Sequence, residues 1–169
     1  RGTGAGMAEA TSRVYSQLSD TYDFMFFFTT HRLEKTPWNA TANFSAGAHT
    51  PVRINYTGTG RSPMDNGAAY GSAARLLGLV VLDAYERGAY SGNATHEMLH
   101  QWGAWIPPDM GLNSADGHYK PRSSAGSLLG GQTWRRSAGT WLLDCTQGRN
   151  GAYQASPLDL YMMGVIGPA

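Results

Sequence analysis

The segment His-Glu-Met-Leu-His at positions 96–100 has two histidines four residues apart, which is the spacing of side chains on one face of a helix. A helix at this position limits how the rest of the chain can fold. On a helix, residues four apart project from the same face one turn apart, which places the imidazoles of His96 and His100 side by side. Met98 and Leu99 supply an apolar face that has to be buried. The segment therefore predicts a short amphipathic helix packed against a neighbouring element.

Local signals mark the ends of this helix and the element before it. Ser91 or Asn93 is a suitable N-cap, because a short polar side chain can accept a hydrogen bond from the first free N–H groups. Gly103, followed by two prolines at positions 107 and 108, predicts the end of the helix. The apolar run Gly78–Asp83 precedes the helix and predicts a buried strand.

Three further segments have a regular apolar pattern. Ala8–Ser19 has apolar residues at helical spacing and predicts an amphipathic helix. Asp23–Thr29 is continuously apolar, which is typical of a strand covered on both faces. Val52–Tyr56 alternates as a half-buried strand does. Residues 31–50 and 57–71 are expected to be irregular.

These elements predict a single α+β domain over the 169 residues. The sheet and the histidine helix fall within a part of about residues 1–104. Residues 105–169 have few periodic signals, and the 22 glycines of the chain imply many turns and irregular connections. The second half is therefore expected to be rich in loops.

Charge and composition exclude several classes of protein. The formal net charge is +1 and only 15% of the residues are charged, with no basic run that could follow a phosphate backbone. A nucleic-acid partner is therefore not expected. The longest apolar run, Phe24 to Phe28, is far too short to span a bilayer. Cys145 is the one cysteine, so the chain has no internal disulfide.

The histidine helix has the residue types of a catalytic zinc site. Two neutral imidazoles one turn apart can bind the same Zn²⁺. Glu97 lies about 100° around the helix from His96, beside the metal, where it can accept a proton from water as a general base. Roughly one shuffled sequence of this composition in 300 contains the pattern by chance. The alternative interpretation is an ordinary amphipathic helix with surface histidines.

A catalytic zinc usually has three protein ligands, so one more is needed after the helix. His118 is the preferred candidate, because it is the one histidine beyond the motif and lies in a turn-rich stretch that can fold back over the helix. The acidic residues that compete with it are Asp109, Asp116, Asp144 and Asp159.

The pattern His96-Glu97-x-x-His100-x-x-Gly103 resembles the start of the metzincin zinc-peptidase motif, and the wider zincin superfamily shares its first five positions. The resemblance implies a mixed sheet, an active-site helix packed beneath it, and a substrate cleft along an edge strand. By order along the chain, Gly78–Asp83 is expected to be that edge. The chain departs from the standard metzincins at Ile106, which stands where they have their third histidine.

A second resemblance lies further along the chain. Tyr-Met-Met-Gly at residues 161–164 resembles the metzincin turn that places a methionine under the metal, and Met163 is the residue chosen for that role. Together with Gly-Ser-Leu-Leu-Gly-Gly-x-x-Trp at residues 126–134, it resembles poorly characterised bacterial secreted metallopeptidases over about residues 94–166. Tyr161 is assigned to stabilise the oxyanion of a tetrahedral intermediate, with Tyr119 as the competing candidate.

These resemblances imply a secreted, extracellular zinc metallopeptidase that acts on a peptide or protein, with the signal segment not present in this chain. His96, His100 and His118 are the expected metal ligands, and Glu97 and Tyr161 the expected catalytic residues. Two alternatives remain. One is a zinc-dependent amidase or esterase that acts on a small molecule or a cell-wall fragment. The other is a binding module without activity on the same fold.

Overall fold

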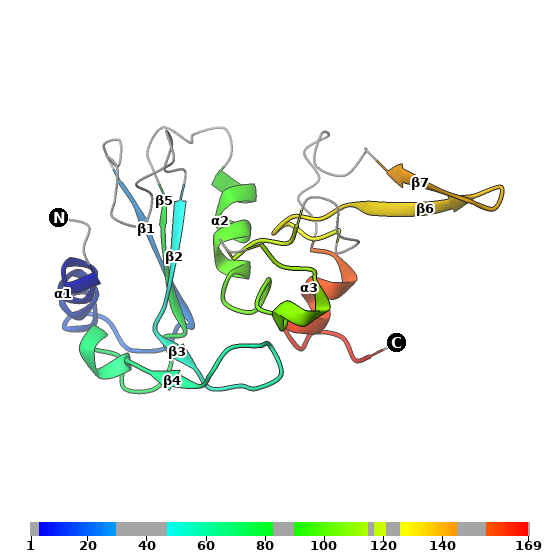
Figure 1. The fold of residues 1–169 in the computed structure, drawn as a ribbon. Helices are drawn as coiled ribbons and strands as arrows, with labels where there is room; N and C mark the ends of the chain where they lie inside the picture. Colours follow the sequence, from blue (N-terminus) through cyan, green and yellow to red (C-terminus); the bar gives the residue numbers. More distant parts are fainter. Residues whose placement is uncertain are drawn as a thin grey trace. The chain divides into compact units, whose positions relative to one another are not determined.

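The computed structural model describes residues 4–29, 47–82, 90–114, 117–120, 126–144 and 155–168, which form short helices and small sheets (Figure 1). The chain divides into two compact units. The first unit is Arg1–Tyr56 with Ser62–Gln101, and the second is Thr57–Arg61 with Trp102–Ala169. The prediction of an α+β chain is confirmed. Asp116 and Cys145 lie outside the described residues.

A three-stranded mixed sheet forms the centre of the first unit. Strand β5 (Gly78–Leu82) lies between β1 (Phe24–Phe28), to which it is parallel, and β2 (Gly47–Pro51), to which it is antiparallel. The strands predicted at Asp23–Thr29 and Gly78–Asp83 are confirmed. The expectation that Gly78–Asp83 is the edge strand is wrong, because β5 has a paired neighbour on both sides.

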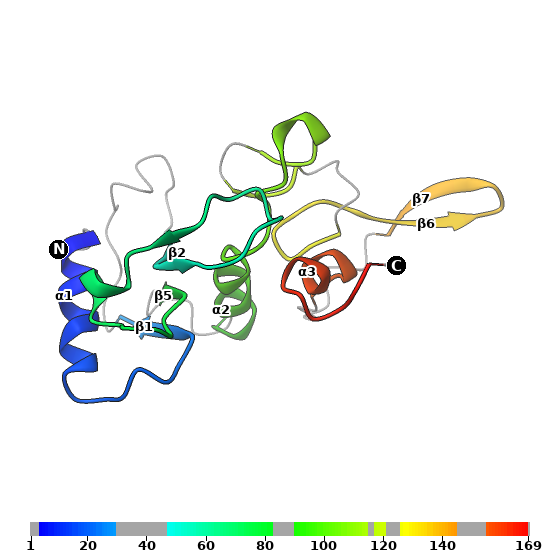
Figure 2. The same ribbon diagram turned by 90° about the horizontal axis from the view of Figure 1, so that it is seen from below.

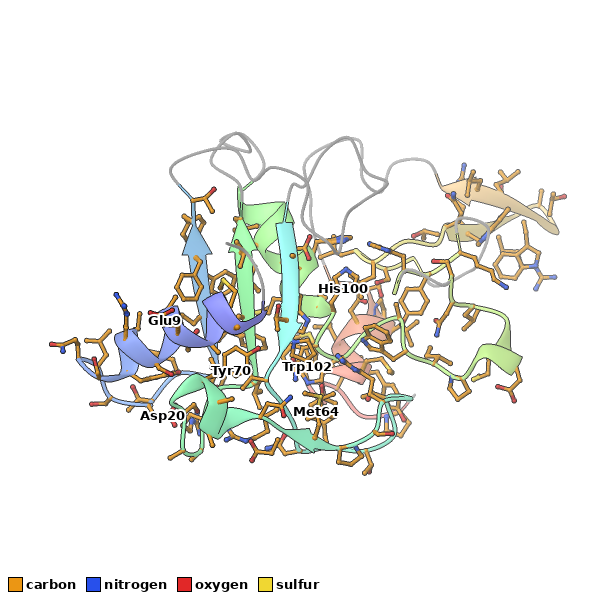
Figure 3. All side chains as sticks on the ribbon, turned by 60° about the vertical axis from the view of Figure 1, so that its left-hand side comes forward. Glu9, Asp20, Met64, Tyr70, His100 and Trp102 are labelled. Carbon is orange, nitrogen blue, oxygen red and sulfur yellow. The ribbon has the colours of Figure 1, made fainter. Side chains whose placement is uncertain are left out.

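Helices α1 (Gly4–Tyr15) and α2 (Tyr90–Leu99) lie on opposite faces of this sheet (Figure 2). On the α1 face, buried Val52, Leu76 and Leu79 form a core cluster. Partly buried side chains from α1, from β1 and from the 3-10 helix η2 (Gly67–Tyr70) pack against that cluster: Met7, Tyr15, Met25, Phe27 and Tyr70, the last of which is labelled in Figure 3. The predicted amphipathic helix is confirmed, although it begins and ends four residues before the predicted bounds.

Helix α2 covers only part of the opposite face. It packs against β5 and β2, and Val80 and Leu82 of β5 are completely buried. Phe26 and Phe28 of β1 stay 37% and 59% exposed. The prediction that Asp23–Thr29 is covered on both faces is therefore wrong, because α2 lies over the other two strands.

The segment after β2 holds a buried charge that its sequence pattern did not predict. The predicted strand Val52–Tyr56 is reduced to β3 (Arg53–Ile54), paired with β4 (Met64–Asp65), and the 3-10 helix η2 (Gly67–Tyr70) follows. Arg53 is only 6% exposed. Its guanidinium donates to Asp65 Oδ2 at 3.0 Å and to the Leu76 carbonyl oxygen at 3.2 Å. These partners allow three consecutive buried residues in place of the expected alternation.

The second unit has little regular structure, as the sequence predicts. Its elements are the 3-10 helix η3 (Pro108–Met110), a hairpin of β6 (Thr133–Ser137) with β7 (Thr140–Asp144), and helix α3 (Pro157–Met162). Helix α3 was missed, although Ser156 is its N-cap and forms a capping box with Asp159. Among the described residues, no helix has the length and apolar character needed to cross a membrane.

Candidate metal centre

Helix α2 (Tyr90–Leu99) carries His96 and Glu97 in its last turn, and His100 directly follows its last residue. The helix begins at Tyr90, before both N-cap candidates, so Ser91 and Asn93 lie inside the helix and the N-cap prediction is wrong. The rings of His96 and His100 lie 5.1 Å apart between centroids, with 82° between their planes. Their expected position on one helix face is confirmed.

The end of α2 is held by Gln101, a residue that sequence reasoning missed. The N–H groups of His100 and Gln101 each bond to the carbonyl three residues earlier, which tightens the last turn. The completely buried Gln101 side chain donates to the Arg53 carbonyl oxygen at 2.7 Å. The Tyr56 hydroxyl donates to the Gln101 carbonyl oxygen. These bonds end the helix before Gly103 and fix the backbone next to His100.

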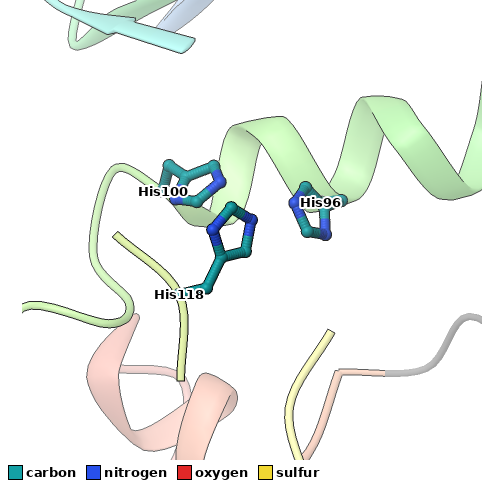
Figure 4. A group of neighbouring side chains, drawn as sticks. All are labelled: His96, His100 and His118. Carbon is teal, nitrogen blue, oxygen red and sulfur yellow. The ribbon is translucent and has the colours of Figure 1, made fainter. Parts of the chain in front are cut away.

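His118 completes a group of three imidazoles. His96, His100 and His118 each offer one ring nitrogen, and these nitrogens all lie within 4.8 Å of one another (Figure 4). Nitrogens bound to one tetrahedral zinc at about 2.05 Å are roughly 3.4 Å apart. The group could therefore hold a metal ion. Three imidazoles suit zinc, and also copper, iron and nickel.

The acidic candidates for the third ligand differ in what the structure shows of them. Asp109 is exposed on η3 and is not part of the histidine group. Asp159 is 1% exposed, and its two carboxylate oxygens accept hydrogen bonds from the Ser127 hydroxyl and from the N–H groups of Leu128 and Ser156. Asp144 is the last residue of β7, and its side chain lies outside the described part of the structure. Of the described candidates, His118 is the one that lies with His96 and His100, and its role as the third ligand stays a prediction.

Glu97 lies against strand β2, where a glycine makes room for it. A Cβ atom on Gly47 would lie 2.8 Å from Glu97 Cγ and 3.0 Å from its Oε1, closer than side chains approach. Burial raises the pKa of the Glu97 carboxyl to about 7. A carboxyl group with that pKa can both accept and release a proton near neutrality.

Strand β2 replaces β5 as the candidate edge for a substrate. In the part of the chain that the structure describes, β2 pairs with β5 on one side only. It also lies next to the catalytic candidate, since Gly47 belongs to β2 and contacts Glu97. An edge strand can accept an extended peptide as a further strand.

The two tyrosines considered for the oxyanion occupy different environments in the second unit. Tyr119 is 2% exposed. Burial and the negative charge of Asp159 raise the pKa of the Tyr119 hydroxyl, although a hydrogen bond from the Ala104 N–H lowers it in part. Such a packed position does not fit a residue that meets substrate. Tyr161 lies on α3 and is 48% exposed, and its role stays a prediction.

Met163 caps the C-terminal end of α3, before Gly164 at a φ of +74°. The N–H of Gly164 bonds to the Tyr161 carbonyl oxygen at 2.9 Å, which makes a tight turn. The predicted turn is present as the end of a helix. The role of Met163 beneath a metal stays a prediction.

Comparison of the chain with protein-family models, with curated proteins and with solved structures found no match.

Proposed function

We propose that this chain is a zinc-dependent metallopeptidase of the zincin type, with His96, His100 and His118 as the metal ligands and Glu97 as the general base. One observation carries the proposal. A ring nitrogen from each of three histidines lies within 4.8 Å of the other two, and Glu97, directly after His96, carries a partly buried carboxylate against the edge strand β2.

Zinc, when bound, would supply a Lewis acid that polarises the scissile carbonyl and makes water more acidic. The protein's own part is to place one base beside that water. Glu97 accepts the proton of the attacking water and delivers it to the leaving amine, so a single carboxyl group serves both halves of the reaction. Its position on α2, one residue from His96, keeps it next to the metal ligands without making it one of them.

Strand β2 would bind the substrate. Antiparallel addition of a peptide to its outer edge would satisfy the N–H and C=O groups of both chains. Because Gly47 of β2 contacts Glu97, a peptide bound along this edge would pass close to the general base. This arrangement favours an extended peptide or protein substrate over a compact small molecule.

The test compares three variants for zinc content and for cleavage of a panel of unfolded proteins. Glu97→Gln keeps the shape of the side chain and removes its basicity, so we expect zinc to be retained and hydrolysis to fall at least about 100-fold. His100→Ala should lose both zinc and activity. Glu9→Gln changes an exposed glutamate of α1 and is the matched control.

Full activity in Glu97→Gln would refute the assignment of the base. A zinc-loaded wild type that cleaves no peptide would point to an amide or ester outside proteins. A wild type purified without chelators that contains no metal would point to a binding module.

A further inference from the structure

Asp159 is a buried carboxylate whose bonds join two distant segments of the second unit. It is 1% exposed and lies in the first turn of α3. Its Oδ2 accepts from the Ser156 N–H at 2.8 Å and from the Leu128 N–H at 3.4 Å, and its Oδ1 accepts from the Ser127 hydroxyl. Bonds of this kind inside a protein are strong, because a charged acceptor is shielded from water.

Ser127 builds a tight turn from the other end of this connection. Its N–H and carbonyl oxygen each bond to Gly130 at 3.0 Å. Its hydroxyl, which donates to Asp159, also accepts from the Leu129 N–H at 2.9 Å. The carboxylate therefore sets both the position and the shape of the turn over residues 127–130.

The turn over residues 127–130 fixes the backbone next to His118. The Tyr119 N–H donates to the Leu129 carbonyl oxygen at 2.9 Å, and Leu129 is completely buried. Gly130 lies so close that a Cβ atom there would be 2.7 Å from the Tyr119 carbonyl oxygen. On the other side, the backbone N–H and the hydroxyl of Ser114 both donate to the His118 carbonyl oxygen at 2.8 Å.

We infer that Asp159 is a positioning residue for the third metal ligand, acting through Ser127 and Leu129 on the backbone of His118. The inference rests on the proposed function, in which His118 binds the metal. Its physical basis is preorganisation: a ligand held in place before binding loses less conformational freedom when the metal arrives. All the hydrogen bonds that link Asp159 to the backbone of His118 lie within the second unit.

The test measures the affinity for Co²⁺ and the visible absorption bands of the bound ion, which report how many ligands it has. Asp159→Ala should weaken Co²⁺ binding roughly 10- to 100-fold, the loss that follows when an outer-shell partner is removed. Its spectrum should shift toward that of His118→Ala. Asp159→Asn should recover most of the affinity, because its amide can accept from the two N–H groups and donate to the Ser127 oxygen.

Asp20 provides a matched control in the first unit. Its carboxylate also accepts from one serine hydroxyl and two backbone N–H groups: those of Ser72 at 2.9 Å, Ala74 at 2.9 Å and Arg75 at 3.2 Å. Asp20→Ala removes these bonds and one from the Tyr15 hydroxyl, all of them away from the histidines, so it should lower stability and leave the Co²⁺ affinity and spectrum unchanged. A general loss of stability is thereby separated from a loss of positioning.

If Asp159→Ala does not fold, Ser127→Ala decides the question, since it removes one link of the same connection and keeps the carboxylate. If the folded Asp159 or Ser127 variant binds Co²⁺ as tightly as Asp20→Ala does, the positioning role of Asp159 is refuted and the proposed function stands. Unchanged Co²⁺ binding in His118→Ala would overturn the third ligand and the inference with it.

Discussion

Glu97→Gln should make the metal-free protein more stable, and the gain should grow with pH. Burial raises the pKa of the Glu97 carboxyl from an ordinary 4.5 to about 7. The unfolded chain ionises this group near its ordinary value, so the folded state holds one more proton between the two pKa values. The free energy of unfolding therefore falls as the pH rises through this window. Glutamine carries no charge and avoids that loss.

The size of the effect follows from the width of the window. A shift of one pKa unit corresponds to about 1.4 kcal/mol, so a shift of roughly 2.5 units corresponds to about 3 kcal/mol. The advantage of Glu97→Gln over the wild type should be below about 1 kcal/mol near pH 5 and about 3 kcal/mol near pH 8.

The assay is urea unfolding followed by circular dichroism at several pH values, in the presence of a chelator. Glu9→Gln is the control, since its side chain is 66% exposed and its ion pair with Arg13 is on the surface. Its difference from the wild type should stay small at every pH. A Glu97→Gln advantage that is constant or shrinks toward pH 8 would refute the argument. Adding Zn²⁺ should reduce the advantage, because a nearby cation favours the carboxylate.

Three further variants test the surroundings of the site. Burial by itself raises the pKa of the Asp20 carboxyl, but hydrogen bonds from backbone N–H groups and from serine and tyrosine hydroxyls outweigh burial and hold the pKa below its usual value. Asp20→Asn should therefore lower the free energy of unfolding near pH 6. Unfolding measured at decreasing pH should show this difference from the wild type disappear below the Asp20 pKa. Gln101→Ala leaves the Arg53 carbonyl oxygen without its donor, and urea unfolding should show a cost of about 1–3 kcal/mol, with weaker zinc binding in a dialysis measurement. Gly47→Ala would press on the Glu97 side chain, so peptide hydrolysis should fall more than zinc content does, and equal activity would show that the contact is relieved without moving the base.

The local parts of this protein could be read from its sequence. The helix that carries His96 and His100 and the strands β1 and β5 follow from apolar periodicity and spacing, which act over a few residues. The same spacing placed Glu97 next to the proposed metal ligands. The start of helix α3 is also encoded locally, because Ser156 and Asp159 have the spacing of a capping box.

Only the tertiary structure decided the relations between these parts. It put β5 in the middle of the sheet and left β2 as the edge beside Glu97, because strand order depends on pairing between distant segments. It gave Gln101 a partner 48 residues away and Asp159 one 32 residues away. From the sequence alone, Asp159 was only one more acidic candidate for the metal. No periodic pattern encodes such bonds, since each depends on two segments meeting after the chain has folded.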